Sequence, residues 1–304
     1  MALLRGSVVA AVVFASLTYS KAGHAQGVVG EKGSLTATLA QDFGFADTLV
    51  ETGGAEFPNV YVNTPITTLS VEYVPVNRLA VTAALPLVGV KYDAEKSGAD
   101  FDPHGPYDDG SYHFTLQDLR VDARYMVLGS PYAVAFNLGA TVPVGDYPVQ
   151  GSAAPGRHLL QGRLGVATSI APSFLPNAFL NLAYELTLSE KYDQSADTEE
   201  FSQTRSDVSL STGYFVRDDL GLFLLSGFRA NHDGVNFVDF AMLTPDQQTY
   251  HDPILKEMAL LLGAGVMYQI NEKFYVTATY THFVMGRNTL NTSFLGASVG
   301  WNIF

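Results

Sequence analysis

The stretch "DLRVDARYMV", residues 118–127, places a charged side chain at every second position. A period of two is typical of a β-strand, because successive side chains of a strand point to opposite faces of the sheet. One face of this strand therefore carries charges, and the other carries an apolar stripe. The charged positions are Asp118, Arg120, Asp122 and Arg124, and the apolar positions are Leu119, Val121, Ala123 and Tyr125.

The same alternation of apolar with polar or small residues recurs from residue 33 to the end of the chain. Each alternating segment is bounded by Gly, Pro, Asn, Asp or Ser, the residues that favour turns. The pattern predicts twelve strands, over residues 33–43, 65–74, 78–90, 115–127, 131–143, 158–170, 178–189, 205–216, 220–230, 255–270, 273–282 and 292–304.

The connectors between these segments alternate between long and short along the whole chain. The long ones cover residues 44–64, 91–114, 144–157, 190–204, 231–254 and 283–291, and several of them are strongly acidic. A bacterial outer-membrane barrel has this arrangement, with short periplasmic turns and long extracellular loops, whereas a β-sandwich has no reason to adopt it. The sequence therefore predicts an all-β fold, a transmembrane antiparallel up-and-down β-barrel of about 12 strands.

The first residues have the composition of a secretory signal peptide. Arg5 precedes an apolar stretch over residues 8–17, and small residues lead up to Ala25. The alternative, a membrane anchor, is less consistent with so short an apolar stretch. We expect residues 1–25 to be a signal peptide and residues 26–304 to form a single barrel domain in the bacterial cell outer membrane.

Composition excludes several classes of protein and site. The chain of 304 residues contains no cysteine, which excludes disulfide bonds and Cys-based metal sites. Its net charge of −13 argues against nucleic acid as a partner, because phosphates require basic surfaces. We expect no cofactor, and we expect outer-membrane lipid and lipopolysaccharide to be the partners.

In a membrane barrel the apolar stripes must face lipid, so the charged stripes face the lumen. The inward rows collect five carboxylates and five arginines, and small residues on the flanking strands leave them room. Two interpretations remain open for these side chains: an ion-pair network that fills a mid-sized barrel, or a constriction that orients a solute. They are Glu72, Asp118, Arg120, Asp122, Arg124, Arg163, Glu185, Arg205, Asp207 and Arg229.

Two segments, 220–230 and 255–270, are apolar on both faces, which predicts an apolar patch on one wall of the lumen. Its inward side chains in the second segment are expected to be Leu261, Gly263, Gly265 and Met267. The loop "GVNFVDFAML", residues 234–243, is also unusually apolar. This loop could fold inward as a plug or receive a hydrophobic solute, or the two apolar segments could simply pack on each other.

Enzymatic activity is not expected. Outer-membrane barrels include hydrolases, proteases and acyltransferases, but the histidines here lie mostly in loops and form no compact His-x-Ser pattern. "NHDG" and "YHDP" place His beside Asp, yet adjacent residues on an extended chain point apart. We assign no catalytic residue.

The acidic loops carry no regular calcium-binding spacing. Their carboxylates are expected to be a solvated outer surface that divalent ions could bridge to lipopolysaccharide, and we assign no metal ligand. These carboxylates include Asp93, Glu95, Asp100, Asp102, Asp108 and Asp109 in one loop and Glu190, Asp193, Asp197, Glu199 and Glu200 in another.

Residues 116–147, "LQDLRVDARYMVLGSPYAVAFNLGATVPVGDY", resemble the outer-membrane β-barrel family named for the MetA pathway of phenol degradation. Ala123, Arg124 and Tyr125 stand at the places of its "L-x-x-x-A-R-Y" motif, and Asp118 at that of the aspartate in the Gly-Asp pair that typically precedes this motif. Gln117 departs from the glycine that is common in that pair. Pro143, Gly145 and Asp146 stand at the places of its "P-x-G-D" motif. The resemblance implies an outer-membrane protein that passes small, often aromatic or hydrophobic, organic molecules, and it implies no catalytic residues.

These features together predict a channel or transporter-like barrel for uptake of a small hydrophobic or aromatic organic solute. The alternative is a structural or adhesive outer-membrane barrel that acts through its acidic extracellular loops.

Overall fold

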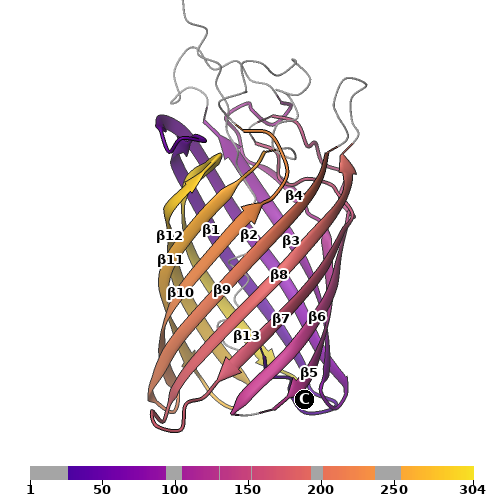
Figure 1. Cartoon of the computed structure of the whole chain (residues 1–304), viewed down its shortest axis with the longest axis vertical. Coiled ribbons are helices and arrows are strands. Elements are labelled where there is room, and N and C mark those ends of the chain that lie inside the picture. The colour runs from indigo at the N-terminus through magenta and orange to yellow at the C-terminus, as the bar shows by residue number, and fades with distance from the viewer. Residues whose placement is uncertain (1–26, 94–104, 130, 152, 193–200, 237–254) are drawn as a thin grey trace, which may run out of the picture.

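The computed structural model describes residues 27–93, 105–129, 131–151, 153–192, 201–236 and 255–304. They form a single antiparallel sheet that closes into a barrel (Figure 1). The strands are β1 (Leu35–Val50), β2 (Glu56–Val76), β3 (Leu79–Tyr92), β4 (His113–Leu116), β5 (Leu119–Leu128), β6 (Tyr132–Val142), β7 (Gln161–Ile170), β8 (Ala178–Tyr192), β9 (Phe201–Arg217), β10 (Leu220–Asn231), β11 (Met258–Gln269), β12 (Phe274–Arg287) and β13 (Thr289–Asn302).

The barrel closes where the first strand meets the last. In β1, Leu39 pairs with Leu69 of β2 on one side and with Val299 of β13 on the other. The short β4 and the longer β5 both pair with β3, so the thirteen strands occupy twelve positions around the ring. The predicted fold class is confirmed.

The fourth predicted strand, residues 115–127, is interrupted in the structure. Contacts with neighbouring segments occupy the residues at the break. The Gln117 backbone amide donates to the Pro86 carbonyl at 2.9 Å, and its side-chain amide donates to the Pro155 carbonyl at 2.7 Å. Gln117 and Asp118 therefore separate β4 from β5.

Two of the predicted long connectors are wrong. Residues 44–64 lie mostly in β1 and β2, which are joined by residues 51–55, and residues 283–291 reduce to Asn288 between β12 and β13. Asn288 has a φ of 52°, and its side chain donates to the Lys256 carbonyl at 2.7 Å and accepts from Thr52 Oγ1 at 2.7 Å. The two hairpins extend past the predicted strand ends because such contacts hold their tips together.

The outer face of the barrel is apolar. Leu138, which points away from the lumen between Asn137 and Gly139, is 63% exposed in the isolated chain. Tyr and Trp side chains near the short turns are also exposed. The rings of Phe274 and Trp301 stack with 5.9 Å between their centroids. Aromatic residues at this level are typical of the interfacial belt of a membrane protein. The outward aromatic residues at this end include Tyr125, Tyr132, Tyr214, Tyr268 and Trp301.

Both ends of the barrel wall lie on the same side as the short turns. The start of β1 and the carboxyl terminus lie at the lower end of Figure 1. In outer-membrane barrels this end faces the periplasm. Within the described ranges, no helix is long and apolar enough to cross a membrane.

Candidate functional site in the barrel lumen

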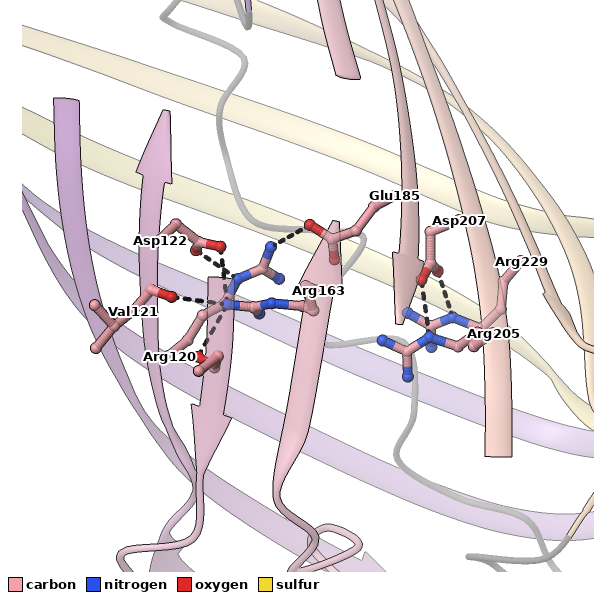
Figure 2. Close-up of polar contacts among 9 residues, drawn as sticks. Arg120, Val121, Asp122, Arg163, Glu185, Arg205, Asp207 and Arg229 are labelled. Atoms are coloured by element: carbon pink, nitrogen blue, oxygen red, sulfur yellow. Dashed lines mark hydrogen bonds and ion pairs between the residues drawn. The ribbon is translucent and has the colours of Figure 1, made fainter. Parts of the chain in front are cut away.

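A lattice of ion pairs crosses the inner wall from β5 to β8. Arg120 Nε lies 2.9 Å from Asp122 Oδ2, and another nitrogen of Arg120 lies 2.9 Å from Glu185 Oε2. Asp122 is shared, because its second oxygen accepts from Arg163 at 2.8 Å. Figure 2 shows these four side chains converging in the space in front of the intervening strand.

Glycine on β6 makes this convergence possible. Gly139 pairs with Asp122 on one side and with Arg163 on the other. A Cβ at Gly139 would lie 2.2 Å from Asp122 Oδ1 and 2.8 Å from Arg163 Nη2. The side chains of β5 and β7 therefore meet directly over β6, where any larger residue would separate them.

A second group of charges lies on β9 and β10. Arg205 Nε and Arg229 Nε each lie 2.8 Å from a different oxygen of Asp207. Glu185 of β8 is the register partner of Asp207, so this group adjoins the first one (Figure 2). Arg229 is completely buried inside the barrel. A buried charge of this kind requires a partner, because desolvation of an unpaired ion is costly.

The third group pairs β5 with β2. Arg124 donates to Glu72 Oε2 at 2.8 Å, and Thr82 of the intervening β3 donates to the same oxygen at 3.2 Å. Nine of the ten residues selected from the sequence therefore lie in three ion-pair groups on the inner wall.

Asp118, the tenth, lies outside these groups. Its carboxylate accepts a hydrogen bond of 2.6 Å from the hydroxyl of Tyr147, in the loop that joins β6 to β7. The same hydroxyl accepts from the backbone amide of His158 at 3.0 Å. Burial and the adjacent carboxylate raise the pKa of Tyr147, which keeps the hydroxyl protonated as a donor.

The loop around Tyr147, between β6 and β7, packs inward rather than into solvent. Val149 and Leu159 are buried against Tyr147. Arg157 donates to Gln203 of β9 and lies 3.9 Å from Glu257, so the loop is attached to β9 and to the segment that leads into β11. Sequence reasoning missed this inward packing, because nothing in the local Pro- and Gly-rich composition distinguishes an inward loop from an outward one.

The acidic loop residues that can be placed do not all face solvent. Asp108 is buried, and its two carboxylate oxygens accept from the backbone amides of Gly105 and Ala153 at 3.1 and 2.7 Å. It therefore joins two loops at the outer mouth, contrary to the expectation of a solvated carboxylate. Glu95, Asp100, Asp102, Asp193, Asp197, Glu199 and Glu200 lie outside the described residues.

An apolar cluster lines the inner wall toward the long-loop end. Leu261 of β11 packs there with inward side chains of β2, β3, β12 and β13 and with Ala153 from the inward loop. Nearer the short turns, Phe223 of β10 is buried over Gly265, where a Cβ would lie 2.4 Å from its ring. The cluster includes Val62, Ile66, Val88, Val90, Leu261, Phe283 and Phe294. The predicted apolar loop lies outside the described residues from 237 onward.

Two histidines contact serines across strands. His232 Nε2 lies 2.7 Å from Ser206 Oγ, and His282 Nδ1 lies 2.7 Å from Ser293 Oγ. Each serine also contacts an exposed tyrosine, which places both sites on the outer face of the barrel. Sequence spacing could not reveal these contacts, since they depend on strand register. In the part of the chain that the structure describes, no three His, Asp or Glu side chains gather as a metal site.

Comparison with known proteins adds a family and a fold. The family model described as "Putative MetA-pathway of phenol degradation" matches residues 46–299. The COG4313 outer membrane channel from Pseudomonas putida F1 has a similar structure, with a TM-score of 0.72 and 12% identity over 91% of this chain and 98% of that one.

Other barrels align less closely. The NanC porin gives a TM-score of 0.51 with 10% identity over 86% of this chain and 98% of that one. The β domain of the Bordetella autotransporter BrkA also gives 0.51, with 12% identity over 90% and 100%. No curated protein matches the chain in sequence. At these identities the structural likeness establishes the fold alone, that of a bacterial outer-membrane β-barrel.

Proposed function

The chain belongs to the family described by the MetA pathway of phenol degradation, and from this premise we propose that it is a channel for a small hydrophobic or aromatic organic solute. The solute enters through the outer mouth, moves along the apolar inner wall and passes the ion-pair lattice. No covalent step is involved. The barrel provides apolar side chains for the apolar part of the solute and charged side chains for a polar substituent.

One observation carries this proposal: a contiguous apolar inner wall lies inside a closed barrel. A barrel that served only as a rigid support for its loops would need side chains that fill its lumen. Ion pairs or small residues could fill it without an apolar cluster. The side chains of this cluster are buried by one another and by Ala153 of the inward loop. We propose that an apolar solute gains by contact with them in the same way, because such contact removes apolar surface from water.

The lattice next to this wall is suited to a polar substituent. Arg120 and Glu185 are each partly exposed to the lumen, with side-chain exposures of 14% and 21%. A hydroxyl or carboxylate on an aromatic ring could exchange hydrogen bonds with these groups while the ring contacts the apolar wall. The lattice thereby acts as a constriction that orients the solute.

Liposome swelling tests the proposal. Proteoliposomes are placed in isosmotic phenolic solutes and, separately, in sugars of similar molecular mass. We expect faster swelling with the phenolic solutes than in protein-free liposomes, and a smaller gain with the sugars. If no solute enters faster than in protein-free liposomes, the barrel is a structural or adhesive one that acts through its outer loops.

A Leu261→Asn variant provides the matched test of the apolar wall. Leu261 is buried within the apolar cluster and belongs to none of the ion pairs. Replacing it with a polar side chain of similar size should reduce phenolic flux more than sugar flux. An equal reduction of phenolic flux and sugar flux would show only that the substitution narrows the lumen for every solute.

A further inference from the structure

The described chain begins inside the barrel at its short-turn end. The backbone amide of Gly27 donates to Ser169 Oγ of β7 at 2.8 Å, and this bond is buried. Ser169 is the register partner of Ala133 in β6. A Cβ on Gly27 would lie 2.6 Å from the Ala133 carbonyl oxygen and 2.7 Å from the Ser169 nitrogen. Gly27 therefore lies directly against the inner wall, closer than any larger residue could.

The next contact of this segment is apolar. Val29 is buried against Val74 of β2 and Ala80 of β3, with Met126 of β5 packed on the same cluster. These wall residues belong to the inward rows of their strands. Val29 therefore holds the segment on the inner surface of β2, β3 and β5, the strands that follow the Gly27 site at the β6–β7 boundary along the ring.

The other end of the segment is fixed where β1 begins. The Gly33 amide donates to the Val74 carbonyl at 2.8 Å, and the Val74 amide donates to the Ser34 carbonyl at 3.0 Å. Gly33 has a φ of 90°, a value that favours glycine and lets the chain turn back into the lumen. Residues 27–34 thus follow the inner wall past β2, β3, β5, β6 and β7, five of the twelve positions in the ring.

Burial alternates over the first four residues of the segment, 27–30. Gly27 and Val29 face the wall and are buried, whereas Val28 between them is 39% exposed. Alternating residues of an extended chain point in opposite directions. Val28 consequently faces away from the wall, toward the open part of the lumen.

We propose that residues 27–32 form the periplasmic constriction of the channel, a strap that is held on the inner wall by Gly27 and Val29 and that sets the size limit for passage. The role in solute passage rests on the proposed function. The narrowing itself is a property of the barrel and affects ions as well as organic solutes, so it can be measured independently.

Single-channel recording tests the strap. The first variant deletes residues 27–32. The second, Val29→Asp, keeps the length but places a carboxylate in the apolar contact, which should release the segment from the wall. The matched control is Val28→Asp, with the same change at the adjacent exposed position. Recording in about 1 M salt screens the added charge over roughly 3 Å.

We expect the deletion and Val29→Asp to raise the single-channel conductance and the size of neutral polymer that enters, and Val28→Asp to leave the conductance at or below that of the wild type. Wild-type conductance in both the deletion and Val29→Asp would overturn the proposal, as would an equal rise in Val28→Asp. Heat-dependent gel mobility confirms that each variant is folded. A conductance shift in a protein that passes no phenolic solute would support the strap and refute only the proposed solute.

Discussion

Arg229 Nε lies 2.8 Å from Asp207 Oδ1 on the neighbouring strand, and this arginine is completely buried although it points into the lumen of a channel-like barrel. Arg205 occupies the second oxygen of the same carboxylate at 2.8 Å. Asp207 is therefore the single carboxylate that these two ion pairs share. The ion pairs on the inner wall therefore include fully buried residues such as Arg229, which stabilise the barrel, and other residues whose side chains are more exposed to the lumen.

Asp207→Ala should destabilise the barrel strongly. The substitution leaves two buried guanidinium groups without this partner, and breaking a buried pair typically costs about 3–5 kcal/mol. Unfolding by urea in detergent or lipid measures the change. Asp219→Ala is the control, since its pair with Arg217 is mostly exposed and should contribute little. A similar loss of stability in both variants would contradict the buried role of Asp207.

Arg120→Ala should change conduction more than stability. Arg120 links Asp122 to Glu185, two strands beyond β6, and it is more exposed to the lumen than Arg229. Its truncation should widen the constriction and raise single-channel conductance. If conductance is unchanged and only the unfolding midpoint falls, the lattice on this wall is structural and does not form a constriction.

Gly139→Ala should displace the ion pair between Asp122 and Arg163, which meet over this glycine. The added methyl would overlap Asp122 Oδ1 and approach Arg163, so one of these side chains must move. We expect altered conductance together with a stability loss of about 1–3 kcal/mol, typical of overpacking. Gly162→Ala on the adjacent strand is the control, because nothing lies within 4 Å of its added carbon. Equal effects at both positions would mean that strand propensity, and not the lattice, explains the change.

Tyr147→Phe should loosen the inward loop. The variant loses the hydrogen bonds to Asp118 and to the His158 amide but keeps the ring in its apolar contacts. Single-channel records should then show more frequent transitions between conductance levels. Tyr112→Phe, at an exposed position in another outer loop, should show the wild-type pattern. Unchanged transitions in Tyr147→Phe would show that this loop is fixed by other contacts.

The strand pattern was predictable from the sequence because lipid and lumen impose opposite demands on alternate residues. The stripe of Leu119, Val121 and Ala123 and the intervening charges follow directly from that constraint. Connector lengths were less predictable. The tip at Asn288 depends on contacts with Lys256 and Thr52, which are distant in sequence.

The partners within the lumen could not be predicted. Which arginine meets which carboxylate depends on strand register and on the small residues between them, such as Gly139 between Asp122 and Arg163. Asp118 belongs to the same alternating row as Arg120, yet it binds a loop tyrosine because the wall is interrupted beside it. Loops that return into a barrel leave no periodic signal in their own sequence.

Chemical blockade of the lumen tests the central claim most directly, namely that solute passes through the barrel and not around it. The chain has no cysteine, so a single introduced thiol is the only one that reacts. Asn137→Cys faces the lumen opposite Arg124, and Leu138→Cys, the next residue, faces lipid. After modification by a bulky thiol reagent, phenolic flux into proteoliposomes should fall for Asn137→Cys and remain unchanged for Leu138→Cys. Undiminished flux through a fully modified Asn137→Cys barrel would contradict the account.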